Sequence, residues 1–334
     1  MVVTDSSDFS AHPAWKAVAF TDGGAGMISQ VRGLMAASGA IGELRQAPLC
    51  RPWKWLWPGM IPTAPWVFCD PGTVHCEEPP DLVITCGRQS IMASLLLKRY
   101  FGSRVLTVHT QDPRIAPERF DLVACPLHDG LVGPQVIGTL GALHHLTPTL
   151  LSEQASEGRR AGLEKLTQPF ALVLLGGPTR NYAFTNEELA AFQQRLDLAI
   201  ARGHQQLAIL PSKRTPARWI DQFVARYGRE QFVWPRTGEN PYLPALALAS
   251  HVIVTCDSVN MISEAATTTR PVYVEHLIER RTARRFRSFH QSFELAGITR
   301  PFRGTLESWT YRPPQATEQV AQIIRERLLT RQPS

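Results

Sequence analysis

Short apolar segments alternate with helical segments along most of this sequence, and the alternation occurs in two series. Apolar runs at residues 16–20, 80–87, 104–110 and 119–126 form the first series, and the second series begins at residue 170. Parallel neighbouring strands need a crossover, usually a helix, so each series predicts a parallel sheet covered by helices on both faces. The two series therefore predict an α/β fold of two facing Rossmann-like domains with a central cleft.

The chain of 334 residues is also too long for one compact core, and two domains are the usual solution at this length. A polar helical stretch at residues 152–168, followed by Pro169, separates the two series and predicts the connection between them. We therefore assign residues 1–165 to an N-terminal domain and residues 166–315 to a C-terminal domain. Residues 316–334 remain as a C-terminal helix that could pack on either domain.

The composition is typical of a soluble globular protein with a modest excess of positive charge. A formal net charge of +6 suits an anionic partner such as a nucleotide, a phosphate or an acidic lipid surface, although a solvated basic surface explains it as well. The first twenty residues show no leader pattern and no apolar run reaches bilayer length, so a cytoplasmic protein is expected. The six cysteines form no C-x-x-C pair, so we expect free thiols and no metal site.

A glycine-rich turn, TDGGAGMISQ at residues 21–30, follows the first predicted strand. Gly23, Gly24 and Gly26 let the backbone turn sharply and approach a ligand closely, because they have no Cβ. The turn is neither a G-x-G-x-x-G motif nor a P-loop, so it indicates a nucleotide only weakly. Asp22 lies at the end of the strand, where open α/β sheets place functional groups, and is a candidate catalytic base. The alternative is a carboxylate that only caps a helix.

Histidines lie near aspartates at two further strand ends. His128 precedes Asp129, and His109 lies three residues before Asp112. An imidazole titrates near neutral pH, so His128 is a second candidate catalytic base, and the pair at His109 is another. A single histidine in a loop more often serves only as a hydrogen-bonding residue, and both interpretations stay open. The absence of a G-x-S-x-G motif argues against an α/β-hydrolase.

The second series carries cations and hydroxyl groups at two strand ends. Gly177 and Arg180 follow its first strand. Ser212, Lys213 and Arg214 follow its second strand. Adjacent cations and hydroxyl groups can make the charge-assisted hydrogen bonds that a diphosphate needs. A solvated basic loop is the alternative, but the agreement of two strand ends favours a ligand.

The segment VIVTCDSVNMISEA at residues 252–265 runs from an apolar strand directly into a helix. Asp257 or Ser258 would cap this helix, and its unpaired N–H groups would suit an anion. Met261 and Glu264 lie in its first two turns, and Glu264 could accept two hydroxyls of a ribose or be an ordinary helix-surface glutamate. With Asn240, a predicted N-cap, the candidate donor-binding residues are Gly177, Arg180, Ser212, Lys213, Arg214, Asn240, Asp257, Ser258, Met261 and Glu264.

Two other segments have compositions that fit an anionic membrane surface. RPWKWLWPGMIPTAPW places Trp53, Trp55 and Trp57 among prolines and cations, as is typical of membrane-interface contacts. The alternative is a folded loop with its indoles in the core. The segment at residues 279–290 could bind an anionic surface or be a solvated linker. Its candidate cations are Arg280, Arg281, Arg284 and Arg285, and no base-reading pattern indicates nucleic acid.

Several motifs together resemble the mitochondrial fission family of ELM type, in consistent order from about residue 18 to about residue 276. Plants have such a protein at the outer mitochondrial membrane, and many bacteria carry homologues. The family pattern has a lysine after the Asp-Gly pair and an asparagine or histidine before the glutamine, where this chain has Gly24 and Ile28–Ser29, so a ligand at that turn would be bound differently or not at all. The motifs are TDGGAGMISQVRGL, PDLVITCGRQS, FDLVACPLHDG with GTLGALH, LPSKRTP, GENPYLPALALA and VTCDSVNMISEA with RPVYV.

The family is similar in layout to two-domain glycosyltransferases of the GT-B type, such as MurG-like enzymes. The similarity implies a nucleotide-sugar in the second domain, with Glu264 on the ribose and Ser258 beside the diphosphate, and an acceptor and membrane side on the first domain. The implied function is sugar transfer from a nucleotide-sugar co-substrate, without a cofactor, to a membrane-associated or envelope acceptor. The protein would then be cytoplasmic or peripheral on the inner membrane. The alternative is a non-enzymatic adaptor that recruits a partner at a membrane surface, as the plant relatives imply.

Overall fold

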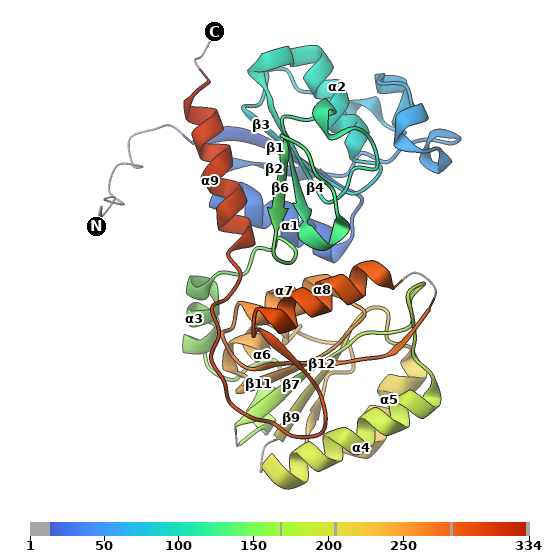
Figure 1. Cartoon of the computed structure of the whole chain (residues 1–334), viewed down its shortest axis with the longest axis vertical. Coiled ribbons are helices and arrows are strands. Elements are labelled where there is room, and N and C mark those ends of the chain that lie inside the picture. The colour runs from blue at the N-terminus through green and yellow to red at the C-terminus, as the bar shows by residue number, and fades with distance from the viewer. Residues whose placement is uncertain (1–13, 168, 204–205, 281–282, 332–334) are drawn as a thin grey trace, which may run out of the picture.

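The structure is a computed structural model that describes residues 14–167, 169–203, 206–280 and 283–331. Two α/β domains follow one another along the long axis of the molecule (Figure 1). Each domain is built on a six-stranded sheet in which neighbouring strands run parallel. The predicted fold of two facing Rossmann-like domains is therefore confirmed.

The first sheet has the strand order β2-β1-β3-β4-β5-β6. Successive residues of a strand point to opposite faces, and each face has its own core, with Phe20 and Val83 on one side and Ala19 and Ile84 on the other. Burial on both faces explains the continuous apolar runs in the sequence. The elements are β1 (Trp15–Thr21), α1 (Ala25–Ala37), β2 (Ala40–Arg45), β3 (Leu82–Cys86), α2 (Ile91–Phe101), β4 (Leu106–Thr110), β5 (Leu122–Pro126) and β6 (Val136–Thr139).

The second sheet has the order β10-β9-β7-β11-β12-β14, and a short antiparallel pair, β8 with β13, lies beside it. A single large core surrounds this sheet. Its strands are β7 (Phe170–Leu175), β8 (Tyr182–Ala183), β9 (Gln206–Pro211), β10 (Phe232–Val233), β11 (His251–Thr255), β12 (Val272–Glu275), β13 (Ile278–Glu279) and β14 (Thr299–Pro301). Its helices are α4 (Asn186–Gly203), α5 (Ala217–Tyr227), α6 (Tyr242–Leu248), α7 (Val259–Ala266) and α8 (Arg284–Leu295).

The chain passes between the domains twice. Helix α3 (Pro148–Ser156) packs against α6, and Leu146 and Leu163 already belong to the second core, upstream of the predicted boundary at residue 165. The helix predicted at residues 152–168 was wrong in extent, because α3 ends at Ser156. Helix α9 (Ala316–Leu329) then returns to the first domain and packs on α1, as Figure 1 shows.

The two candidate membrane-facing segments adopt different structures. The tryptophan-rich segment folds as a series of short 3-10 turns between β2 and β3, beginning with Trp53–Trp55. In the arginine-rich segment, for which a solvated linker was one alternative, residues 284–290 form the start of α8. That helix buries Phe289 and Phe293, so its apolar face anchors it to the second core.

Candidate functional site

The order of the strands places one crevice in each domain. The chain leaves β1 for β2 on one side and then returns to β3 on the other side. In the second sheet it leaves β7 for β9 and β10, and then returns to β11 on the opposite side. Open α/β sheets bind ligands beyond the carboxyl ends of the strands at such reversals. The two candidate crevices therefore follow β1 and β3 in the first domain, and β7 and β11 in the second.

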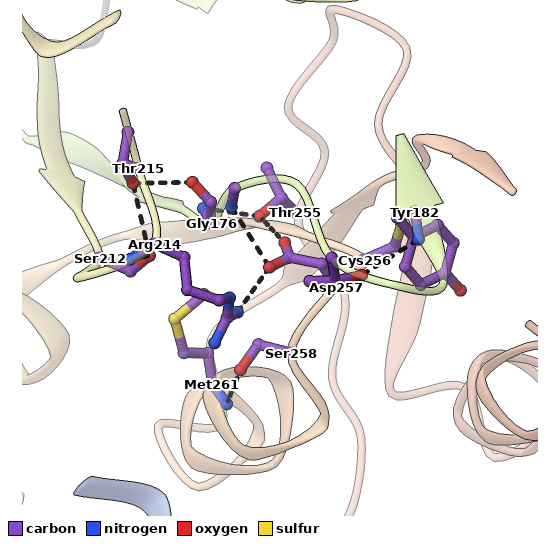
Figure 2. Close-up of polar contacts among 12 residues, drawn as sticks. Gly176, Tyr182, Ser212, Arg214, Thr215, Thr255, Cys256, Asp257, Ser258 and Met261 are labelled. Atoms are coloured by element: carbon purple, nitrogen blue, oxygen red, sulfur yellow. Dashed lines mark hydrogen bonds and ion pairs between the residues drawn. The ribbon is translucent and has the colours of Figure 1, made fainter. Parts of the chain in front are cut away.

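Three loops meet closely at the second crevice (Figure 2). The N–H of Gly176 donates to Thr255 Oγ1 at 2.8 Å, and Thr215 Oγ1 donates to the Gly176 carbonyl at 2.7 Å. A Cβ at Gly177 would lie 2.2 Å from the Arg214 carbonyl oxygen, so this loop approach requires glycine. The predicted residues at the ends of β7, β9 and β11 are therefore brought together at one edge of the sheet.

Asp257 links these loops from below the surface. Its side chain is fully buried and accepts from Thr255 Oγ1 at 2.6 Å and from the Gly177 N–H at 3.3 Å. It also pairs with the Arg214 guanidinium at 2.5 Å, although the Arg214 side chain is still 44% exposed. Arg214 thus has a structural partner already, and only part of its guanidinium faces the solvent.

Helix α7 begins at this edge of the sheet. Ser258 is its N-cap, and its hydroxyl accepts from the Met261 N–H at 3.3 Å (Figure 2). The serine satisfies one of the unpaired N–H groups of the first turn, and the others are available to an anion. Of the two predicted caps, Asp257 and Ser258, the structure has Ser258 at the N-cap.

Glu264 lies one and a half turns further along α7, in the interface between the domains. Its carboxylate is 7% exposed and accepts from Ser29 Oγ of the first domain at 2.9 Å and from Tyr242 Oη at 2.5 Å. Burial raises the pKa of the Glu264 carboxyl, while these two donors act in the opposite direction. Burial raises the pKa of the Tyr242 phenol as well, so the tyrosine remains a donor. Both oxygens that a ribose would need are therefore in use within the protein.

The other donor-side candidates differ in their surroundings. Lys213 and Arg180 are exposed near the crevice, whereas the Ser212 hydroxyl accepts from the Arg214 N–H at 3.2 Å. Asn240 lies before α6, and its side chain accepts from the Tyr242 N–H at 3.1 Å, but the N-cap position of the helix is Pro241 rather than the predicted Asn240. One residue that sequence reasoning missed is Arg236, which donates to the Ser212 and Thr215 carbonyls and holds this loop.

A cleft of about 430 Å³ lies between the first crevice and the start of α7. Asp22 lines it at the end of β1, where its carboxylate accepts from the N–H groups of Gln89 and Ser90 at 3.1 Å each. This is the capping role of the alternative interpretation, at the start of α2 rather than α1. Whether Asp22 also acts as a base stays a prediction.

Three of the side chains that line the same cleft form ion pairs between the domains. Arg285 of α8 lies 3.1 Å from Asp112 and 3.2 Å from Asp129, both in the first domain. His128 lines the cleft too, with its ring against Phe289. Burial lowers the pKa of His128, and Arg285 acts in the same direction while Asp129 opposes it. An uncharged imidazole facing a cleft can accept a proton.

His109 is the less suitable base of the two candidate pairs. It is 1% exposed, its Nδ1 lies 2.9 Å from Thr85 Oγ1, and its ring stacks on Phe120. Burial lowers the pKa of His109 to about 3. The loop that follows β4 contains Gln111 and Arg114. Both residues have left-handed backbone angles, which non-glycine residues seldom adopt. Strain of this kind often occurs at functional sites, and no sequence pattern indicated it.

At some positions of the glycine turn, the glycine is explained by the backbone angle or by packing rather than by a ligand. Gly23 has φ of 88°, which favours glycine, and Gly24 is exposed at the start of α1. Gly26 faces α7, where a Cβ would lie 1.8 Å from Asn260 Nδ2. A larger residue at the third glycine would therefore displace the Asn260 side chain at the contact between the domains.

The predicted membrane-facing side chains divide into two groups. Trp55 and Trp57 are 65% and 53% exposed, whereas Trp53 packs against the first core and against Trp66. Arg280 and Arg284 are exposed, Arg285 is engaged in the cleft, and Arg281 lies outside the described residues. Within the described ranges, no helix has the length and apolar character needed to cross a bilayer.

A family model described as mitochondrial fission ELM1 matches residues 25–328 of this chain. The mitochondrial fission protein ELM1 of Arabidopsis thaliana is 29% identical over 283 residues, which cover 76% of this chain and 65% of that protein. The chain thus spans less than two thirds of that relative's length.

Solved structures with the same fold include a UDP-GlcNAc 2-epimerase and a protein solved with UDP. The UDP-GlcNAc 2-epimerase from Methanocaldococcus jannaschii aligns with a TM-score of 0.56 at 10% identity, over 93% of this chain and 99% of that one. MnaA of S. aureus, solved with UDP, aligns with a TM-score of 0.52 at 12% identity, over 94% of this chain and 89% of that one. At these identities the similarity shows a common fold, and it confirms the predicted GT-B-like layout.

Proposed function

The chain belongs to the mitochondrial fission ELM1 family, and on that premise we propose that it binds a nucleotide-sugar between its domains and transfers the sugar to a membrane-associated acceptor. The observation that carries the proposal is the convergence of the β7, β9 and β11 loops on the N-terminus of α7 at the second crevice. A protein of the same fold, the S. aureus MnaA, was solved with UDP, which supports a nucleotide as the ligand.

The residues at this crevice suggest how the ligand would be held. The diphosphate would lie at the N–H groups after Ser258, with Lys213 and Arg180 offsetting its charge as the sugar leaves. Glu264 would take the ribose hydroxyls. Across the cleft, Asp22 and His128 are the two candidate bases for the acceptor hydroxyl. His128 is the better placed, because two backbone N–H groups already occupy the Asp22 carboxylate.

A thermal-shift screen with UDP, GDP, ADP and CMP tests the donor site. At 100 times its dissociation constant, one of these nucleotides is expected to stabilise the fold by about 2.7 kcal/mol. The shift should disappear in Glu264→Ala, because the ribose would lose its acceptor. It should persist in Glu187→Ala, which removes an exposed carboxylate at the start of α4. A well-folded protein that none of the four nucleotides stabilises would contradict the proposal.

We also propose that the tryptophan-rich segment holds the protein at an anionic membrane surface. Trp55, Trp57 and Met60 are more than half exposed, and the cations of Arg51 and Lys54 lie 5.1 and 5.6 Å from the Trp55 ring. Exposed indoles flanked by cations suit the interface of an anionic bilayer.

The same segment contacts one of the residues that line the cleft. Arg88 lines the cleft and donates to the carbonyl oxygens of Lys54 and Leu56. A protein held at the bilayer by Trp55 and Trp57 would therefore bring the cleft close to an acceptor anchored in that bilayer.

Sedimentation with vesicles that contain anionic phospholipid tests this surface. The double variant Trp55→Ala/Trp57→Ala is expected to bind the vesicles at least tenfold less tightly, because each buried indole contributes roughly 2 kcal/mol. Leu295→Ala, which removes a side chain that is 82% exposed on the second domain, should bind like the wild type. Equal binding by all three proteins would exclude this surface.

A non-enzymatic adaptor is the second candidate function, and one observation favours it. Glu264 and Arg214 already have protein partners, so both could be retained for structure alone. An adaptor would bind vesicles through the tryptophan-rich segment and give no thermal shift with any nucleotide. The two experiments above therefore separate the two functions.

A further inference from the structure

One face of α7 presents a polar stripe to the first domain. Its members follow the spacing i, i+3, i+4 and i+7, which places them in line along a helix. Each member has a partner across the interface: Asn260 with Gln30, Ser263 with the Ala142 N–H, Glu264 with Ser29, and Thr267 with His144, at 3.2, 2.9, 2.9 and 3.2 Å. Helix α7 therefore contributes a row of four hydrogen-bonded contacts to the docking of the second domain on the first.

Helix α1 carries a matching face of small and polar residues with the same spacing, namely Gly26, Ser29, Gln30 and Gly33. A Cβ at Gly26 would lie 1.8 Å from Asn260 Nδ2 of α7, whereas one at Gly33 would lie 2.2 Å from the His144 carbonyl oxygen, which belongs to the first domain itself. Glycine disfavours a helix relative to alanine, so the close approach explains its presence here. The sequence of α1 thus fits this docked arrangement in detail.

Glu264 is at the centre of the contact. Its two oxygens accept from Ser29 and Tyr242, and the Ser29 hydroxyl in turn lies 2.8 Å from His145 Nδ1. We propose that the contact between α1 and α7 is a closed state that competes with the nucleotide, because the Ser29 hydroxyl and the ribose need the same carboxylate. This inference rests on the proposed function and adds a regulation of that site by the first domain.

The chemistry of the contact makes it reversible. Interfaces between domains that consist of individual hydrogen bonds open more readily than large apolar ones. Two ion pairs of Arg285, to Asp112 and Asp129, add to the closed state at the mouth of the cleft. If the nucleotide binds only the open state, its apparent affinity falls in proportion to the open fraction. Weakening the contact should therefore tighten nucleotide binding.

Calorimetric titration with UDP tests the competition. Ser29→Ala removes the hydrogen bond to the Glu264 carboxylate and is expected to bind UDP about tenfold more tightly than the wild type. Ser38→Ala is the matched control, because this buried hydroxyl at the end of α1 donates only to the Leu34 carbonyl. It should bind UDP like the wild type. Unchanged or weaker binding by Ser29→Ala would overturn the competition.

Solution X-ray scattering of the ligand-free protein tests the closed contact by itself. Gly26→Leu places a side chain against Asn260 and is expected to increase the radius of gyration by separating the domains. Gly24→Leu, two residues earlier and exposed, should leave it unchanged. An unchanged radius of gyration in Gly26→Leu would overturn the closed state. If UDP bound neither the wild type nor any variant, both the proposed function and the competition with the nucleotide would be wrong. The scattering result would still decide whether the contact between the domains exists.

Discussion

Acidification from pH 6.5 to pH 4.5 is expected to remove most of the protein's stability, because three buried histidines stay uncharged in the fold. Burial lowers the pKa of His109 to about 3, of His290 to about 3 and of His144 to about 4. In the unfolded chain each histidine titrates near pH 6.5. Below that pH these histidines are protonated in the unfolded state but stay neutral in the folded state. The free energy of unfolding therefore falls as the pH falls.

The magnitude follows from linkage. Between its folded-state and unfolded-state pKa values, each such histidine lowers the free energy of unfolding by about 1.4 kcal/mol for every pH unit of acidification. Three histidines therefore lower it by roughly 8 kcal/mol over two pH units. A typical domain has a free energy of unfolding of only about 5–15 kcal/mol. The carboxyls of Glu264 and Glu275, whose pKa values burial raises, act in the opposite direction over the same window. The three histidines outnumber these two carboxyls, so the net effect of acidification is a loss of stability.

Urea unfolding at pH 7.5 and pH 4.5 measures this loss. His109→Gln gives the matched comparison, because a neutral amide can still pair with Thr85 but does not titrate. The variant should lose about one third less stability between the two pH values than the wild type does. Equal free energies of unfolding at pH 7.5 and pH 4.5 would show that the histidines are not buried uncharged.

The sheets could be predicted from the sequence because their strands are buried on both faces. The five buried residues of β3 form such a run, and the equivalent runs of β7 and β11 revealed the second sheet in the same way. Strand β2 was not predicted, because it is an edge strand in which buried, half-buried and exposed residues occur together. Its Ile41, for example, is 72% exposed. Its residues show neither the continuous apolar run of a strand buried on both faces nor a regular alternation of buried and exposed positions.

Helix α8 was missed for a different reason. Its first turn consists largely of arginines, and such a composition is typical of a solvated segment. However, Phe286, Phe289 and Phe293 follow the helical spacing and lie on one face. That periodicity was present in the sequence and could have revealed the helix. The side of the molecule on which α9 packs could not be derived, since an amphipathic helix fits any apolar surface of suitable shape.

The positions of the candidate site residues were easier to predict than their partners. Topology brings the carboxyl ends of parallel strands to one edge, so Gly177, Arg214 and Ser258 were expected together. The pair of Ser29 with Glu264 joins residues 235 positions apart across two domains. No local pattern encodes the docking of one domain on another, so a binding residue and a docking residue look the same in the sequence.

Arg214→Ala is expected to destabilise the protein by about 2–3 kcal/mol, whereas Lys213→Ala should change the free energy of unfolding by less than about 0.5 kcal/mol. Arg214 provides the countercharge of the fully buried Asp257 carboxylate, and Lys213 is exposed. Loss of one partner of a buried ion pair typically costs about 3–5 kcal/mol. The cost is lower here, because Thr255 and Gly177 still donate to Asp257 and because Arg214 is partly exposed.

Urea unfolding at pH 7.5 of the two single variants measures the difference between these neighbouring cations. The double variant Arg214→Ala/Asp257→Asn adds a decisive comparison, because a neutral amide needs no countercharge and its oxygen can still accept from Thr255 or Gly177. It should regain part of the stability that Arg214→Ala loses. If the double variant were less stable than Arg214→Ala by the full effect of Asp257→Asn alone, the two side chains would not be coupled, and Arg214 would be free to serve a phosphate with its whole guanidinium.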